Sequence, residues 1–206
     1  MYKYSFFNDY SEGAHPKVLE LLSTSNLEQE EGYGTDSLSI RASKLIKNQI
    51  EKPDAAIYFV SGGTQANLIV LASLMKPYES VISVSTGHIN IHEAGAIEAT
   101  GHKINAVTTS DGKLNVDLIK SVVASHEDEH MVKPKVVFIS NSTEIGTIYK
   151  KTELESISKF CRQNNLYLYL DGARLGSGLS SKESDLTLAD VARLVDIFYI
   201  GGTKNG

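Results

Sequence analysis

Short apolar runs alternate with helical patterns along most of this 206-residue chain. Six runs predict buried strands, because each is short, apolar and bounded by turn residues; they are residues 55–60, 81–84, 104–107, 135–140, 166–170 and 196–200. Helices are predicted over residues 36–46, 65–75, 92–100, 116–125 and 152–162, with a last helix opening at 187. Strands that alternate with helices are joined by crossovers, so we expect an α/β fold with a mostly parallel sheet and helices on both faces.

Composition and charge narrow the class of protein. The chain is long enough for one sizeable core, and its net charge of −5 does not indicate a nucleic acid or an anionic membrane as a partner. We find no apolar stretch of transmembrane length, and residues 1–7 are too few and too polar for a signal peptide. The single cysteine, Cys161, cannot form an internal disulfide, which fits a reducing compartment such as the cytoplasm. We assign no metal ligands.

The most informative local feature is the glycine-rich segment 201–206, which follows the last predicted strand and carries Lys204. Ligands of parallel sheets bind at the carboxyl ends of the strands. A lysine on a tight loop at such a position is a candidate for a Schiff base with a carbonyl cofactor. A solvated surface lysine is the competing interpretation.

A second glycine turn, Ser61-Gly62-Gly63-Thr64-Gln65, lies between a predicted strand and a predicted helix. Bare N–H groups at a helix N-terminus, together with a hydroxyl, can bind a phosphate. A plain turn with Thr64 as an N-cap explains the same residues. The segment lacks the lysine of a P-loop and the glycine spacing of a dinucleotide fingerprint, which disfavours a nicotinamide oxidoreductase.

Asp171 and His88 each follow a predicted strand. A partly buried Asp171 needs a cation, which is either Arg174 in a structural pair or a protonated ring nitrogen of a ligand. In the second case Arg174 is free to bind a carboxylate. His88 either stacks on a ligand or is a satisfied polar residue. We expect the other histidines to be structural or exposed; they are His15, His92, His102, His126 and His130.

A phosphate cradle, a stacking ring, an acid for a pyridinium and a lysine for a carbonyl are the contacts that pyridoxal phosphate requires. Their order resembles the large domain of the aspartate-aminotransferase-like, fold type I enzymes. Within these the chain is similar to the threonine aldolase and aromatic β-eliminating lyase family over nearly its whole length. The matching segments are 7–11 with Pro16, 32–36, 61–67, 87–88 with 93–96, 141–146, 171–174 and 202–204.

The resemblance implies a role for each matching residue. Lys204 would hold pyridoxal phosphate covalently, Asp171 would bind its ring nitrogen and His88 would stack on its ring. Gly63 and Thr64 would bind its phosphate.

For an amino acid substrate, the resemblance implies contacts from Arg174, Asn8 and Glu144. Tyr33 matches a tyrosine that reaches the site of a neighbouring subunit, which implies a homo-oligomer, either a dimer or a tetramer.

The reaction that the resemblance implies is the retro-aldol cleavage of a β-hydroxy-α-amino acid, such as threonine or allo-threonine, to glycine and acetaldehyde. His88, Glu144 and a bound water are all candidates for the base that removes the hydroxyl proton. Two alternatives remain open. One is β-elimination from an aromatic amino acid, and the other is a non-catalytic remnant that only binds the cofactor.

Two departures from the family pattern affect this prediction. Glu144 stands where many threonine aldolases have a histidine, and the lysine loop reads Gly-Thr-Lys-Asn-Gly where many relatives have Ser-Lys-Gly-Leu-Gly. The family also has a small C-terminal domain after the lysine loop, whereas this sequence stops two residues past Lys204. We therefore expect residues 1–206 to be an N-terminal segment plus the large domain of a truncated enzyme, with an exposed sheet edge.

Overall fold

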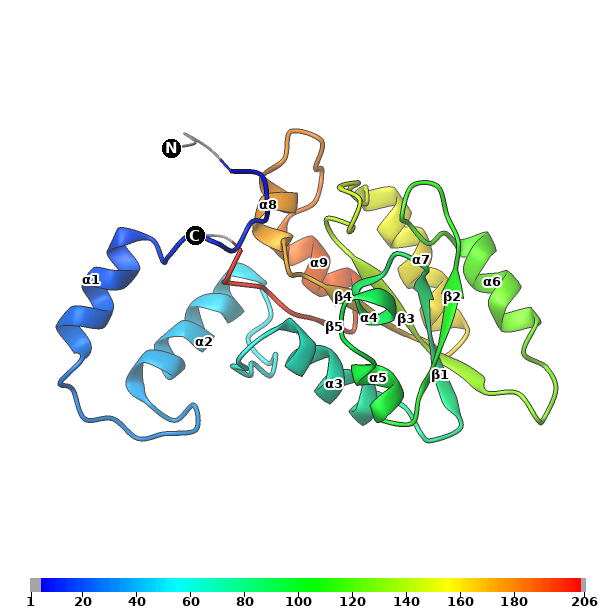
Figure 1. Ribbon diagram of the computed structural model, residues 1–206, viewed down its shortest axis with the longest axis horizontal. Coiled ribbons are helices and arrows are strands. Elements are labelled where there is room, and N and C mark those ends of the chain that lie inside the picture. The colour runs from blue at the N-terminus through cyan, green and yellow to red at the C-terminus, as the bar shows by residue number, and fades with distance from the viewer. Residues whose placement is uncertain (1–4, 205–206) are drawn as a thin grey trace.

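A parallel five-stranded sheet forms the centre of the computed structural model, which describes residues 5–204 (Figure 1). The strands are β1 (Glu79–Val84), β2 (Lys103–Val107), β3 (Lys133–Ser140), β4 (Tyr167–Asp171) and β5 (Ile197–Phe198), in the order β2-β1-β3-β4-β5. Every pairing is parallel. The predicted α/β class and parallel sheet are confirmed.

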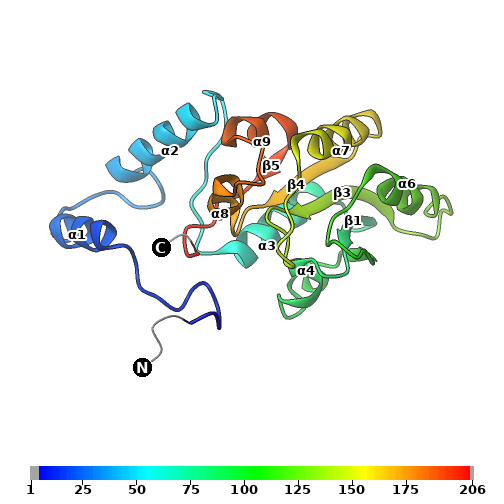
Figure 2. The ribbon, with the colours of Figure 1, turned by 90° about the horizontal axis from the view of Figure 1, so that it is seen from above.

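Helices cover both faces of this sheet, as Figure 2 shows from above. The helices are α1 (Pro16–Ser25), α2 (Ser37–Gln49), α3 (Gly63–Leu74), α4 (His88–Ile91), α5 (Ala96–Ala99), α6 (Val116–Ala124), α7 (Lys151–Gln163), α8 (Leu175–Ser180) and α9 (Leu188–Leu194). None of these helices is long and apolar enough to cross a membrane. The crossovers bring the carboxyl ends of the strands to one edge, where a ligand site is expected.

Side chains of the central strands alternate between two cores. On β3, Val137 and Ile139 join the core under α6, α7 and α9, while Val136 and Phe138 join the core under α3 and α5. All four side chains are at most 2 % exposed. This period of two is the geometry of an extended strand, and burial on both faces explains why the run is continuously apolar.

One of the predicted strands is wrong. Residues 55–60 form no strand, and no described strand pairs with them. Tyr58 is 84 % exposed and Phe59 is 52 % exposed, so this apolar run is not buried. A run becomes a strand only where a neighbouring strand supplies hydrogen-bond partners.

Other boundaries also differ from the prediction. The helix expected over 92–100 shrinks to α5, because Ala94 and Gly95 have left-handed φ angles of 50° and 74° that interrupt it. The strand expected over 196–200 is regular only at Ile197–Phe198. The helices α1, α4 and α8 were not predicted.

The sequence Thr152-Glu153-Leu154-Glu155 has the pattern of a capping box, which predicts that Thr152 caps the helix, and this prediction is wrong. The carboxylate of Glu153 accepts a hydrogen bond from the Lys150 N–H over 2.8 Å, and α7 begins at Lys151. The predicted Asp36 cap of α2 and the predicted opening of α9 at Thr187 are confirmed. Asp36 accepts from the Ser39 N–H, and Thr187 accepts from the Asp190 N–H.

Candidate active site

A cavity of about 120 Å³ opens at the carboxyl end of the sheet. It is lined by residues from four separate stretches of the chain, namely Gly63, Thr64, His88, Ala173, Tyr199, Gly201, Thr203 and Lys204. The structure therefore brings together four residues that were predicted from widely spaced motifs: Gly63, Thr64, His88 and Lys204. Asn205 and Gly206 of the predicted lysine loop lie outside the described residues.

The N-terminus of α3 forms one wall of the cavity. Gly62 is the residue before the helix, and no side chain caps the first turn. Thr64 is the second helical residue, so its interpretation as an N-cap is wrong. The Ser61 N–H and hydroxyl both donate to Gln65 Oε1, at 2.7 and 2.9 Å, which closes the preceding turn. The uncapped N–H groups and the helix dipole favour an anion at this wall.

His88 is held from behind by a chain of buried polar groups. Its Nδ1 lies 2.8 Å from Glu93 Oε1, which also accepts from Asn67 Nδ2 over 2.6 Å. The Tyr169 hydroxyl donates to Asn67 Oδ1 over 2.8 Å and completes the chain. The hydrogen bond with Glu93 raises the pKa of His88, and burial opposes that rise only in part.

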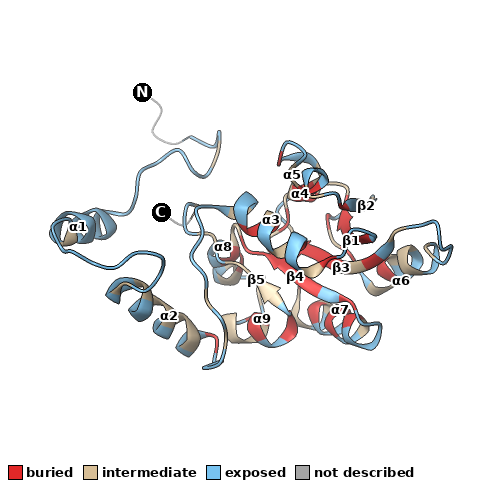
Figure 3. Cartoon of the chain, turned by 90° about the horizontal axis from the view of Figure 1, so that it is seen from below, coloured by how far each residue is buried: buried red, intermediate tan, exposed pale blue. Residues whose placement is uncertain are grey.

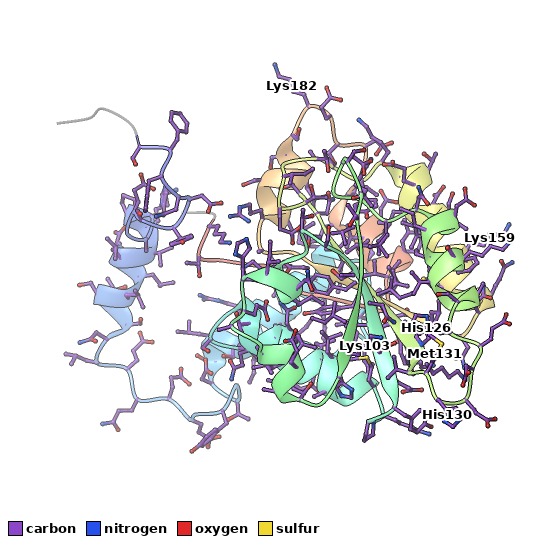
Figure 4. The ribbon with its side chains drawn as sticks, turned by 45° about the vertical axis from the view of Figure 1, so that its right-hand side comes forward. Lys103, His126, His130, Met131, Lys159 and Lys182 are labelled. Carbon is purple, nitrogen blue, oxygen red and sulfur yellow. The ribbon has the colours of Figure 1, made fainter. Side chains whose placement is uncertain are left out.

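His92 is closer to the site than predicted. It is exposed, as expected, but its ring centroid lies 5.6 Å from that of His88. His126 and His130 lie in the segment between α6 and β3, away from the cavity (Figure 4).

Asp171 ends β4 and is 3 % exposed. Its Oδ1 accepts from the Tyr199 hydroxyl over 2.5 Å and from the Ala173 N–H over 2.9 Å. Burial raises the pKa of Asp171, while these two hydrogen bonds and His88 lower it and Glu144 raises it further. Asp171 is not part of the cavity lining and meets the cavity through Tyr199.

The structural pair considered for Asp171 and Arg174 is wrong. Arg174 instead binds Asp9 with both arms of its guanidinium, at 2.5 Å from Nε to Oδ2 and 3.0 Å from a terminal nitrogen to Oδ1. This fork geometry is strong for a carboxylate, and it holds the pKa of Asp9 below its usual range. Asp171 is close in sequence, but the backbone directs the guanidinium toward the N-terminal segment.

Glu144 lies beside His88. Its Oε1 accepts from the backbone N–H of His88 over 2.9 Å and from the Ser140 hydroxyl over 2.7 Å. Its Oε2 is buried and has no hydrogen-bond partner among the described residues. A buried carboxylate oxygen without a partner is costly, so this atom is a candidate to receive a proton or a ligand donor.

Lys204 is half-buried, with Nζ 5.7 Å from the centroid of the Tyr10 ring. Within residues 5–204 it forms no ion pair. The remaining predicted residues lie outside the cavity. Asn8 Oδ1 accepts from the Tyr10 N–H and the Ser11 hydroxyl in a local turn. Tyr33 is fully exposed in the loop between α1 and α2.

Three residues near the site were not predicted from the sequence, namely Asn67, Glu93 and Tyr199. Tyr199 lies inside an apolar run and gives no polar signal in the sequence. Glu93 belongs to a matched segment, but only the fold shows that its carboxylate reaches His88. A polar Asn67 within the apolar helix α3 is the one signal that could have been used, since a buried amide requires partners.

Comparisons with known proteins agree with this geometry. A profile of the family described as beta-eliminating lyase matches residues 12–206. The chain is 34 % identical, over 203 residues, to the low specificity L-threonine aldolase of Pseudomonas aeruginosa, and the match covers 98 % of this chain and 58 % of that protein. It is similar to a solved structure of threonine aldolase from Leishmania major, with 56 % identity and a TM-score of 0.97 over 98 % of this chain and 59 % of that one.

A more distant likeness supports the fold alone. An aspartate aminotransferase mutant from Thermus thermophilus is 15 % identical with a TM-score of 0.57, over 75 % of this chain and 40 % of that one. The chain thus has the aspartate-aminotransferase-like fold, and it spans less than 60 % of the length of the two threonine aldolases.

Replacing Glu93 with Gln should lower the pKa of His88, because a neutral amide no longer favours the imidazolium. The raised pKa of the folded state means that the pair stabilises the fold fully below the ordinary histidine pKa. That contribution is lost as the pH rises through the raised value. Titration of the His88 ring by ¹⁵N NMR measures the change.

Glu98→Gln is the matched control, because Glu98 is exposed on the neighbouring helix α5. An unchanged His88 titration in Glu93→Gln would show that Glu93 does not set its charge.

Proposed function

This chain belongs to the beta-eliminating lyase family, and from that premise we propose that it is the cofactor-binding part of a pyridoxal-phosphate-dependent aldolase. The proposed reaction cleaves a β-hydroxy-α-amino acid, such as threonine or allo-threonine, to glycine and acetaldehyde. The observation that carries the proposal is the convergence of an uncapped helix N-terminus, an imidazole and a lysine on one cavity. The high identity to a threonine aldolase from Leishmania major supports the same reaction.

The residues present fit pyridoxal phosphate. The family and its structural neighbours are enzymes that depend on this cofactor. At the α3 wall, a Cβ on Gly63 would come within 2.7 Å of the Tyr199 hydroxyl. Glycine at this position therefore avoids a steric clash between the helix N-terminus and Tyr199. The donors at that wall suit a phosphate dianion, and a lysine amine suits an aldehyde. When bound, this cofactor withdraws electrons from the α-carbon of an amino acid.

We assign each residue a task that follows from its environment. The N–H groups of Gly63 and Thr64 bind the phosphate, and Lys204 supplies the amine that holds the cofactor covalently. His88 would stack on the cofactor ring, and its hydrogen bond with Glu93 fixes the orientation of the imidazole. Asp171 places a negative charge below the cavity to favour a protonated ring nitrogen.

The substrate carboxylate is assigned to Arg174, with Asn8 close by. Arg174 already binds a carboxylate, that of Asp9, in the fork geometry that an amino acid carboxylate would adopt. Binding substrate in this way requires exchange of Asp9 for the incoming carboxylate.

The proton of the substrate hydroxyl needs an acceptor near the cavity. Glu144 Oε2 is buried and unpartnered, and His88 has one ring nitrogen that is not engaged by Glu93. Both side chains are candidates for this acceptor, as is a bound water. Glu144 and His88 are held next to each other, because Glu144 Oε1 accepts a hydrogen bond from the His88 backbone N–H.

Replacing Lys204 with Ala should remove covalent cofactor binding and reduce turnover by orders of magnitude, because it is the one amine among residues 5–204 that lines the cavity. Incubation with pyridoxal phosphate, reduction with borohydride and peptide mapping measures the label. Lys159→Ala and Lys182→Ala are the controls, since both side chains project from the surface (Figure 4) and neither belongs to the cavity lining. Label that persists at its original level in Lys204→Ala would contradict the assignment.

The products decide between the aldolase and the alternatives. We expect acetaldehyde from threonine or allo-threonine, measured with an alcohol dehydrogenase assay. Release of ammonia from an aromatic amino acid without acetaldehyde would instead favour β-elimination, which the description of the family allows. Cofactor binding with neither product would favour a non-catalytic remnant.

We further propose that residues 1–206 are an N-terminal segment followed by the large domain, and that the protein is a cytoplasmic homo-oligomer serving glycine formation. The helices α1 and α2 support the oligomer, because neither contains a fully buried residue (Figure 3). Leu22, Ile40 and Leu45 are each about 60 % exposed. An amphipathic helix with an uncovered apolar face requires a partner, and we assign a second copy with Tyr33 at its contact.

Sedimentation equilibrium should give a dimer or tetramer mass, and Leu45→Glu should shift it toward the monomer by placing a charge on the apolar face of α2. Gln49→Glu adds the same charge at an exposed polar position of α2 and should leave the mass unchanged. A monomeric wild-type protein would overturn this assignment.

A further inference from the structure

Tyr199 stands between the cavity and the buried carboxylate of Asp171. It lines the cavity, whereas Asp171 does not. Its hydroxyl donates to Asp171 Oδ1 over 2.5 Å, and the Ala173 N–H donates to the same oxygen. The Tyr199 hydroxyl therefore links the cavity wall directly to one oxygen of the Asp171 carboxylate.

The backbone around Tyr199 is arranged for this close approach. The Tyr199 N–H donates to the Leu170 carbonyl over 3.3 Å, which places it beside the end of β4. A Cβ on Gly172 would collide with the Tyr199 carbonyl oxygen, and a Cβ on Gly63 would lie 2.7 Å from the hydroxyl. Two glycines on different elements thus make room for the backbone and the side chain of one tyrosine.

Some features of the surroundings of Asp171 favour its ionised form and others disfavour it. Burial at 3 % exposure disfavours the carboxylate, and so does the negative charge of Glu144. The donors from Tyr199 and Ala173 favour the carboxylate. The charged or titratable groups that interact with Asp171 come from α4, the loop after β3, β4, the residue before α8 and the segment after β5; they are His88, Glu144, Tyr169, Arg174 and Tyr199.

Tyr199 remains a donor across the physiological pH range. Burial and the charge of Asp171 raise the pKa of Tyr199 far above its usual range. The hydroxyl therefore keeps its proton. Its strongest hydrogen bond is one that it donates to a charged acceptor such as a carboxylate.

We propose that Tyr199 is a positioning residue for Asp171, whose buried carboxylate it keeps ionised and fixed in orientation through the hydroxyl hydrogen bond. The role of this charge, to stabilise a protonated ring nitrogen in the cavity, rests on the proposed function. The ionisation of Asp171 can be measured in the chain without cofactor, so the role of Tyr199 and the proposed function can be tested separately.

The test is a ¹³C NMR titration of the Asp171 carboxyl in the cofactor-free chain, with the resonance identified by its loss in Asp171→Asn. Tyr199→Phe keeps the ring and removes the donor, so the Asp171 midpoint should shift to higher pH. Tyr149→Phe is the matched control, because this buried hydroxyl bonds only to Leu114 and its loss should leave the midpoint in place.

A second variant guards against misfolding of Tyr199→Phe. Gly63→Ala should push the hydroxyl away from its present position and shift the Asp171 midpoint in the same direction, with Tyr199 intact. If Asp171 titrates in Tyr199→Phe and Gly63→Ala as it does in the wild type, the proposal is overturned. Shifted midpoints in a chain that takes up no pyridoxal phosphate would support this proposal while removing the proposed function.

Discussion

The parallel pairing of β1, β3 and β4 is the constraint on which the rest of the structure depends. Parallel neighbours must be joined by crossovers, so each strand is followed by a connection that starts at the same edge of the sheet. His88 follows β1, Glu144 follows β3 and Asp171 ends β4. These three residues are far apart in sequence, but they meet at one edge because parallel pairing places the carboxyl ends of all three strands on the same side of the sheet.

The site at that edge depends on satisfying buried polar groups. Glu93 and Asn67 would be costly in an apolar core, yet each is hydrogen-bonded in the chain that ends at His88. The buried carboxylate of Asp171 is likewise stabilised by hydrogen bonds, which the Tyr199 hydroxyl and the Ala173 N–H donate. Fixed partners of this kind orient charges before a ligand arrives, which is the physical basis of a preorganised site.

Several features were accessible from the sequence because they depend on local pattern. The helix at 65–75, the strand at 135–140 and the Asp36 cap of α2 follow from periodicity and side-chain chemistry within a few residues. The strand predicted at 55–60 failed for the opposite reason, since an apolar run does not specify its partner. One of the two interpretations of Arg174 paired it with Asp171, three residues before it, whereas its partner Asp9 lies 165 residues away.

The sequence by itself determined the class of fold and the residues whose chemistry could serve a site, namely Lys204, His88, Asp171, Gly63 and Thr64. Only the tertiary structure decided that Tyr199 stands beside Asp171, that Glu93 holds His88 and that Arg174 binds Asp9. The physical reason is the separation along the chain of the residues that interact. Strand and helix patterns are set by interactions between near neighbours, but a hydrogen bond between distant side chains depends on how the whole sheet brings their elements together.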